Sequence, residues 1–312
     1  MKVILLIINM FIVLIVNCTE HPKKQLSGLE LIKFYYLQQD YEMVLDLVKY
    51  SDVDSLQQDS VKFYKGMALK NQEKWDIAAD EIIDLIIFAK SDSLRDSAIL
   101  EIKDIVIELQ SAEAINKTAY LINNLQEGFP KSDFLIFLAE IYEKNHLFGE
   151  AREAYQEVLK DSTFSDTTQI YLKIAVSDIF LKKYDDSIDI LEQILLFQDE
   201  SYAEDVLFFY YVATESNEDM TQAKEILIYL YKNYPLNRNR FEIIEALSNI
   251  FYEENQYLMS WYLLDEVYKI SSEAEKFRIY QKIYDLKKTL LEEAISIDQF
   301  KYFKPILGDE EN

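Results

Sequence analysis

The stretch that decides the fold is residues 132–161, SDFLIFLAEIYEKNHLFGEAREAYQEVLKD. Its first half carries apolar residues three or four positions apart, and its second half repeats that spacing, at Leu135, Leu138, Ile141 and Tyr142 and then Phe148, Ala151, Tyr155 and Val158. This period places the apolar side chains on one face of each of two helices. Ala139 and Ala151 are small, so the two helices can approach closely where they cross. The stretch is therefore predicted to form an antiparallel helical hairpin.

A hairpin this short cannot bury both of its apolar faces alone, so it needs stacked neighbours. An aromatic residue followed three positions later by a small or β-branched residue recurs at Tyr41, Trp75, Phe148, Tyr184 and Tyr257. Ile115 and Met220 take the same place in two further stretches, and successive anchors lie 33 to 40 residues apart. Seven stacked hairpins are therefore predicted. In the fifth, Phe180 stands only four residues before Tyr184, which predicts a tighter turn there.

The order of large and small residues resembles the tetratricopeptide repeat superfamily. The resemblance implies an all-α, right-handed superhelical solenoid of about seven antiparallel helical hairpins with a C-terminal capping helix. The repeats occupy residues 29–290, and Gly66 is interpreted as a close-packing position inside a first helix. A last helical segment is expected from Glu273 to Phe303, with a polar outer face, and residues 291–312 are assigned to the cap and an acidic tail.

The composition supports a helical chain. Half of the residues are apolar and 28% are charged, and only five glycines and four prolines occur among 312 residues. So few turn-forming residues disfavour a sheet of many strands. The formal net charge of −24 argues against binding to nucleic acid or to an anionic lipid surface.

The amino terminus has the pattern of an export signal. Residues 1–17 contain one early lysine and then an apolar run of 14 residues, which is short for a membrane span but suits a secretory signal. Residues 18–28 have no helical pattern and are expected to form a tether. The protein is therefore predicted to be exported.

Cys18 directly follows the apolar run and is the only cysteine of the chain. The sequence Leu14-Ile15-Val16-Asn17-Cys18 resembles the lipobox of bacterial lipoproteins, although Ile15 and Asn17 depart from the usual pattern. The resemblance implies lipidation of Cys18 and a membrane-anchored position in the bacterial cell envelope, on the periplasmic side or at the surface. Cleavage nearby and an uncleaved N-terminal anchoring helix are the alternatives. The ending Asn233-Tyr234-Pro235 is also loosely similar to repeats in envelope lipoproteins of outer-membrane assembly.

In this superfamily the first helix of each hairpin lines the concave side, which implies a partner-binding groove. Its candidate residues here are Phe63, Met67, Ile136, Glu140, Glu143, Leu172, Val176, Phe208, Val212, Glu245, Asn249 and Tyr252. This mixture of apolar and acidic residues suits a protein segment with apolar anchors and basic flanks. The alternative is that many of these residues contact the neighbouring hairpin and belong to the core.

No pattern of catalytic chemistry is found in the sequence. The two histidines, His21 and His146, lack the spacing of metal ligands, and no phosphate-binding loop or nucleophile motif occurs. We therefore expect no cofactor, no metal and no enzymatic activity. The predicted function is a protein–protein interaction scaffold, as a lipid-anchored component of an envelope complex. The alternatives are a carrier or chaperone that holds an exported client or apolar ligand, and an accessory subunit of an envelope enzyme.

Overall fold

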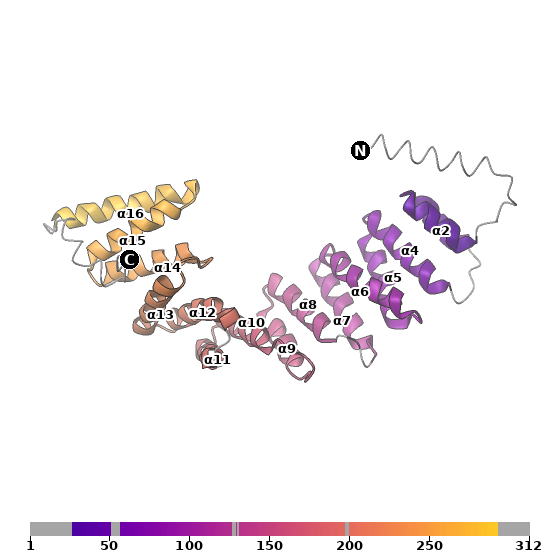
Figure 1. Ribbon diagram of the computed structural model, residues 1–312, viewed down its shortest axis with the longest axis horizontal. Coiled ribbons are helices and arrows are strands. Elements are labelled where there is room, and N and C mark those ends of the chain that lie inside the picture. Colours follow the sequence, from indigo (N-terminus) through magenta and orange to yellow (C-terminus); the bar gives the residue numbers. More distant parts are fainter. Residues whose placement is uncertain (1–26, 51–56, 127–128, 130, 197–199, 293–312) are drawn as a thin grey trace. The chain divides into compact units, whose positions relative to one another are not determined.

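The computed structural model describes residues 27–50, 57–126, 129, 131–196 and 200–292 (Figure 1). Within these ranges the chain is entirely helical, which confirms the predicted fold class. The expected signal, Cys18, most of the tether and the acidic tail lie outside the described residues. The chain divides into two compact units, residues 1–129 and 130–312. Each unit is described by itself below.

The first unit consists of stacked antiparallel helices. They are α2 (Gly28–Leu37), α3 (Tyr41–Tyr50), α4 (Gln58–Asn71), α5 (Trp75–Phe88), α6 (Asp92–Ile107) and α7 (Ser111–Asn124). Each helix packs on the next one, and α2 also contacts α4, α4 contacts α6, and α5 contacts α7. Hairpins therefore stack with like helices side by side. We call the first helix of each hairpin helix A and the second helix B.

The second unit continues the same arrangement. Its helices are α8 (Lys131–Lys144), α9 (Phe148–Val158), α10 (Thr167–Phe180), α11 (Tyr184–Leu196), the 3-10 turn η1 (Glu200–Tyr202), α12 (Ala203–Ser216), α13 (Met220–Asn233), α14 (Arg240–Glu253), α15 (Tyr257–Ile270) and α16 (Glu273–Glu292). Sequential helices again pack on each other, and α10 also contacts α12. The helix that follows the seventh hairpin, α16, begins at Glu273, the residue expected from the sequence. Phe277, Tyr280, Tyr284 and Leu291 are exposed on α16, so the polar outer face expected of this helix is wrong. Among the described residues, none of the helices is both long and apolar enough to cross a membrane.

The starts of helix B reproduce the repeat. They fall at Tyr41, Trp75, Ser111, Phe148, Tyr184, Met220 and Tyr257, which lie 34 to 37 residues apart. Six of these are the anchors predicted from the sequence. The third is not Ile115: α7 begins one turn earlier, at Ser111, and the buried Ala114 takes the place of the small residue. The sequence alignment failed there because Ser111 is not aromatic.

Most A–B turns share one backbone conformation that the sequence did not reveal. A residue with positive φ stands two positions before helix B, at Gln39, Glu73, His146, Lys182, Glu218 and Asn255. In the fourth hairpin the N–H of His146 donates to the carbonyl of Glu143, and the N–H of Leu147 to that of Tyr142, each at 2.9 Å. This is the Schellman ending of a helix, usually built on glycine. The connection before Tyr184 has three residues, as do the others, so the expected tighter turn in the fifth hairpin is wrong.

Small residues stand where helices A and B cross, as predicted. Gly66 is buried in the interior of α4, and a Cβ atom there would lie 2.7 Å from Cδ1 of Ile82 in α5. This confirms that Gly66 is a close-packing position. In the seventh hairpin Ser248 and Ser260 meet with their hydroxyl oxygens 2.9 Å apart. A larger side chain at either position would push the two helices apart.

Candidate functional site

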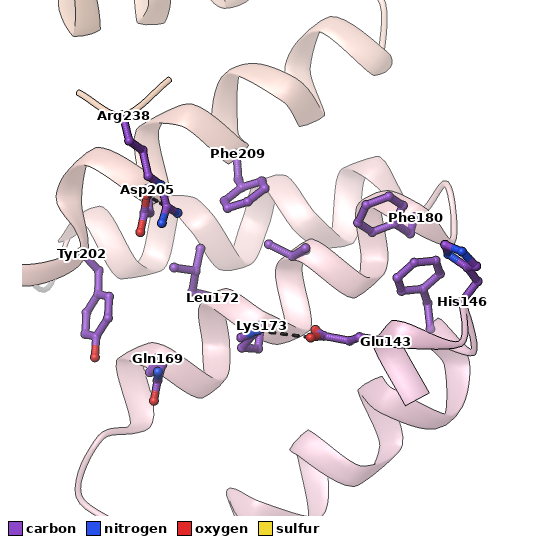
Figure 2. Close-up of a pocket in the computed structure, with 12 residues that line it drawn as sticks. Glu143, His146, Gln169, Leu172, Lys173, Phe180, Tyr202, Asp205, Phe209 and Arg238 are labelled. Atoms are coloured by element: carbon purple, nitrogen blue, oxygen red, sulfur yellow. Dashed lines mark hydrogen bonds and ion pairs between the residues drawn. The ribbon is translucent and has the colours of Figure 1, made fainter. Parts of the chain in front are cut away.

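A cavity of the second unit opens along its A helices. Its volume is about 550 Å³. It is lined by Glu143, His146, Phe148, Gln169, Leu172, Lys173, Val176, Phe180, Tyr202, Asp205, Phe209 and Arg238. The lining residues come mainly from α8, α10 and α12, the A helices of three successive hairpins. Phe148 at the start of α9 and Arg238 in the α13–α14 connection also belong to the lining. Figure 2 shows Phe180 and His146 at one end and Tyr202 and Gln169 at the other.

An aromatic stack forms one edge of this cavity. The rings of Phe148 and Phe180 lie nearly parallel, with centroids 4.2 Å apart, and the ring of His146 lies 5.9 Å from that of Phe148. Phe180 ends α10 and is 58% exposed, although the stack covers one of its faces. An exposed aromatic side chain held by a neighbour is pre-organised, so it can contact a ligand at little entropic cost. This edge was not among the sequence-predicted site residues, because Phe148 fits the core pattern of helix B.

Two ion pairs lie among the residues that line the cavity. Nζ of Lys173 donates to Oε2 of Glu143 at 3.1 Å, and Arg238 approaches Asp205 at 2.7 Å (Figure 2). Both pairs are partly exposed to solvent, so each contributes little to stability. The two pairs balance the formal charge of the lining residues. The cavity thus combines apolar lining residues with polar groups that can form hydrogen bonds to the backbone of a bound peptide segment.

Tyr155 of α9 is fully buried beneath the acidic residues of α8. Burial raises its pKa far above the ordinary value, and the nearby Glu143 and Glu140 raise it further. The phenol therefore stays protonated at all physiological pH values. Such a group does not serve as an acid or base near neutral pH. Within the described ranges, no group of three or more His, Cys, Asp or Glu residues has an arrangement that could hold a metal ion.

The structure places the predicted groove residues in three environments. Met67 and Leu172 are buried; Phe63, Ile136, Glu143, Val176, Phe208, Val212 and Glu245 are partly buried; Glu140, Asn249 and Tyr252 are exposed. The cavity brings together Glu143, Leu172 and Val176. Phe208 instead packs against the core of the second unit, with its ring 6.0 Å from that of Tyr211. Phe63 and Met67 belong to the first unit.

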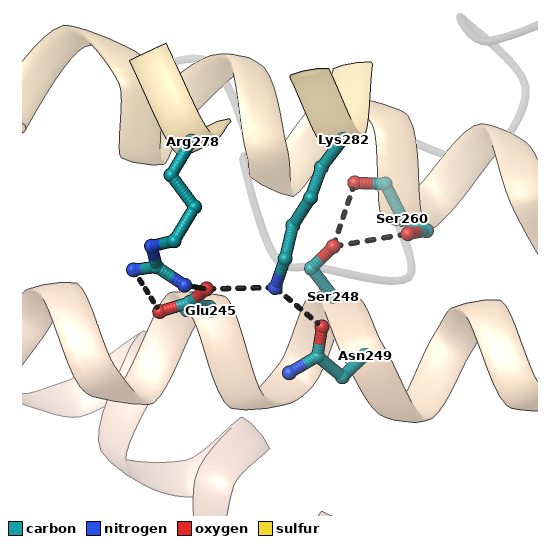
Figure 3. Close-up of polar contacts among 6 residues, drawn as sticks. All are labelled: Glu245, Ser248, Asn249, Ser260, Arg278 and Lys282. Atoms are coloured by element: carbon teal, nitrogen blue, oxygen red, sulfur yellow. Dashed lines mark hydrogen bonds and ion pairs between the residues drawn. The ribbon is translucent and has the colours of Figure 1, made fainter. Parts of the chain in front are cut away.

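Glu245 and Asn249 line a second cavity, of about 310 Å³, but α16 engages both. Arg278 and Lys282 of α16 bind the Glu245 carboxylate, at 2.9 Å for Nη2 of Arg278 and 2.8 Å for Nζ of Lys282 (Figure 3). Lys282 also donates to Oδ1 of Asn249 at 3.3 Å. Burial alone would raise the pKa of Glu245, but the hydrogen bonds from Arg278 and Lys282 outweigh it and hold that pKa below its usual value. Glu245 therefore anchors α16 to α14.

Comparisons with known proteins bear on the fold. Neither the protein-family models nor the curated protein sequences contain a match to the chain. Among solved structures, the Naa15/Naa10 complex bound to HypK-THB is similar, with a TM-score of 0.50 and 11% identity, over 89% of this chain and 40% of that one. A tetratricopeptide repeat protein from Parabacteroides merdae matches with a TM-score of 0.42 and 11% identity, over 83% of this chain and 97% of that one. The C-terminal part of a TPR repeat-containing protein from Cytophaga hutchinsonii matches with a TM-score of 0.43 and 10% identity, over 84% and 96%.

At identities this low the likeness concerns the fold alone. The repeated hairpin, its small crossing residues and its stacking of A on A define the architecture as a tetratricopeptide-like α-solenoid.

Proposed function

We propose that the chain is a non-enzymatic protein–protein interaction scaffold, exported and held at a bacterial cell envelope by a lipid on Cys18. The observation that carries the scaffold role is the cavity on the A helices of three successive hairpins, with its exposed Phe148–Phe180 stack. A surface that spans several repeats can bind an extended segment along its length. The lipid anchor rests on the sequence around Cys18.

The apolar lining of the cavity favours a partner segment with an apolar or aromatic anchor, and the negative charge of the surrounding chain favours basic flanks. Leu172, Val176 and Phe209 form an apolar lining that suits the anchor. The exposed Glu140 lies on the same helix as Glu143, one turn away, and the whole chain has a formal charge of −24. Such a field attracts basic segments and speeds their approach, while the anchor supplies most of the binding energy.

A photo-crosslinking residue in the full-length protein, produced in its own bacterium, tests this proposal. We expect the residue at position 180 to give one discrete protein adduct. The same residue at Tyr171 is the matched control, because Tyr171 is 41% exposed on the same helix but lines a different crevice, against α11. Adducts of equal intensity from both positions, or from position 171 alone, would contradict a binding role for the cavity.

The membrane anchor has its own test. Cys18→Ser is expected to release the protein from membranes and to abolish labelling with fatty acid, because the acyl chains attached to Cys18 would supply the membrane affinity. If the variant stays membrane-bound and the wild type takes up no fatty acid, the N-terminal run is an anchor itself. The scaffold role would survive that result.

A carrier of an apolar ligand is the second candidate. The cavity volume of about 550 Å³ falls in the range of small-molecule sites, and much of its lining is apolar. Native mass spectrometry of the protein purified from its source separates the two roles. A carrier would show a bound small mass that Val176→Arg removes, whereas a scaffold would show no such mass and would keep its protein adduct at position 180.

A further inference from the structure

Two adjoining cavities of the second unit are rich in carboxylates. The second cavity, of about 310 Å³, is lined by α12, α14 and the start of α13, and a third, of about 450 Å³, is lined by α13 and α14. Met220, Ile250 and Glu253 line both, so the two cavities share a wall. We call the second and third cavities together the acidic cavities. Their lining includes one cation, Lys224, and six carboxylates, those of Glu215, Glu225, Glu242, Glu245, Glu253 and Glu254.

Four of these six carboxylates have no cation beside them. Arg278 and Lys282 bind Glu245 (Figure 3), and Lys224 binds Glu254. Among the described residues, no lysine or arginine forms an ion pair with the other four. In the first cavity, of about 550 Å³, both lining carboxylates are by contrast paired with a basic side chain. The acidic cavities therefore carry a negative charge that the described part of the chain does not neutralise.

One of the four, Glu215, is held in place by a buried phenol. Tyr211 lines the second cavity and is only 6% exposed. Burial raises the pKa of the Tyr211 phenol, and the charge of Glu215 and its hydrogen bond with that phenol raise it further. The phenol therefore remains a donor at neutral pH and fixes the Glu215 carboxylate at the cavity wall. A carboxylate that is already positioned binds a cation at a lower entropic cost.

The apolar residues of the acidic cavities fit the stem of a long basic side chain. Met220, at the start of α13, is 39% exposed, and it lines both cavities together with Ile250. Lysine and arginine pack their aliphatic stems on apolar surface while the charged group stays among polar groups. The stem can thus lie on Met220 while the cation reaches Glu215 or Glu253. Within the described ranges, these carboxylates have no arrangement that could hold a metal ion.

Helix α12 connects the acidic cavities with the first cavity. Its residue Phe209 lines the first cavity, whereas Tyr211 and Glu215 line the second. Phe209 and Glu215 are six positions apart, which corresponds to about 9 Å along a helix. An extended segment spans about 9 Å with about three residues. A segment anchored in the first cavity can therefore place its third or fourth following residue at the acidic cavities.

We propose that the acidic cavities bind a lysine or arginine side chain of the same partner segment whose apolar anchor occupies the first cavity, three or four residues away along that segment. This inference rests on the proposed scaffold function and adds the place and the chemistry of a second contact. The anchor supplies most of the affinity, and the basic residue fixes the register of the segment. A segment with an acidic residue at this place is repelled.

A photo-crosslinking residue at position 220 of the full-length protein, produced in its own bacterium, tests the second contact. We expect an adduct with the same protein that is linked from position 180. Mass-spectrometric sequencing of the linked peptides should place a lysine or arginine three or four residues from the apolar residue linked to position 180. Tyr229 is the matched control position, because it is 51% exposed on α13 but lines neither of the acidic cavities.

Removal of two charges tests the electrostatic part without a change at position 220. Glu215→Gln with Glu253→Gln should lower the yield of the position-180 adduct about three- to tenfold, because each exposed carboxylate supplies a modest attraction. Glu204→Gln with Asp189→Asn is the control, since it removes the same charge from α12 and α11 outside the cavities, and it should leave the yield unchanged. All four residues are exposed, so both double variants are expected to fold.

The inference is overturned if position 220 gives no adduct, or an adduct with a different protein, while position 180 still gives its discrete adduct. A linked segment without a lysine or arginine at the expected spacing would overturn it as well. Equal yields from the two double variants, or an equally strong adduct from position 229, would do the same. In each of these cases the scaffold role stands. Absence of an adduct at position 180 would instead refute the scaffold role, and the second contact with it.

Discussion

Asp178 of α10 is fully buried, and its Oδ1 accepts a hydrogen bond from Nε of Arg152 in α9 at 2.7 Å. The pair joins the fourth hairpin to the fifth, and Asp178 stands on the same helix as Val176 and Phe180 of the cavity lining. The second carboxylate oxygen of Asp178 is buried without a partner among the described residues. The guanidinium is therefore the one charge that compensates this carboxylate within the described structure.

Arg152→Met is expected to lower the free energy of unfolding by about 2–4 kcal/mol, because it leaves the Asp178 carboxylate buried without a cation. The value is below that of a fully buried pair, since Arg152 is partly exposed. Urea denaturation followed by circular dichroism measures the change. Lys160→Met is the control, since it breaks an exposed pair with Glu157 and should change nothing measurable. Equal effects of the two substitutions would refute the importance of the Asp178 pair.

Lys182→Gly is expected to raise the free energy of unfolding by about 0.5–1 kcal/mol, because a non-glycine residue pays for positive φ. Asn255→Gly, at the same place in the seventh hairpin, should gain less, since asparagine tolerates this conformation better. Leu109→Gly is the control: it stands at the same place in the α6–α7 connection, without positive φ, and should not stabilise. Thermal unfolding of the three variants gives the order. A larger gain from Leu109→Gly would contradict the role of the turn conformation.

Ala151→Leu is expected to destabilise the fourth hairpin by about 1–3 kcal/mol, because Ala151 is fully buried where α8 and α9 cross. The loss should be local, since each repeat contacts its neighbours alone. Hydrogen exchange should therefore show faster exchange in α8 to α10 and little change in α14 and α15. Glu150→Leu, exposed on the same helix, serves as the control. Uniform loss of protection throughout the second unit would indicate one cooperative core instead.

The attachment of α16 is expected to depend on acid pH. The pKa of Glu245 lies below its ordinary value of 4.5 in the folded protein, although burial acts in the opposite direction, because Arg278 and Lys282 bind its carboxylate. Its contribution to stability is thus present above the unfolded-state pKa and is lost as the pH falls through the folded-state pKa. The protection factors of the α16 amides, in which the intrinsic pH dependence of hydrogen exchange is divided out, should fall as the pH is lowered below about 4.5.

Glu245→Gln tests the assignment of this pH dependence. The variant should exchange faster than the wild type at neutral pH and should approach it in acid, where both lack the charge. Glu242→Gln, exposed on the same helix, is the control and should follow the wild type at every pH. A pH profile of the Glu245 variant that runs parallel to that of the wild type would assign the acid effect to other carboxylates.

The period of the helical hairpins was readable from the sequence because it is a local property. Apolar spacing sets the buried face of a helix, and small residues such as Gly66 and Ala151 mark where two helices cross. The six anchors that begin helix B were found for this reason. The remaining start of a helix B, Ser111 in the third hairpin, was not predicted, because the serine side chain does not carry the aromatic or apolar signal of the other six. The turn conformation at Lys182 escaped because no glycine marks it.

The candidate site was only partly readable. The sequence placed Glu143, Leu172 and Val176 on the correct side of helix A, and the structure brings these three together in one cavity. It did not separate the half-buried Phe208, which packs on the core, from Phe180, which is exposed at the rim. Spacing gives the direction of a side chain within its own helix, whereas its exposure depends on what the adjacent hairpin places against it.

The sequence by itself thus determined an all-helical chain of stacked hairpins, because periodicity and residue size act between neighbours in the chain. The tertiary structure alone decided which of those side chains are exposed to a partner and which are buried or paired within the chain. It stacks Phe180 on Phe148 and buries the Asp178 carboxylate against Arg152. It also places the Glu245 carboxylate within hydrogen-bonding distance of the Arg278 guanidinium, which lies 33 positions away in the sequence. These pairings depend on the rise and rotation from one hairpin to the next, which are fixed by the packing of whole helices.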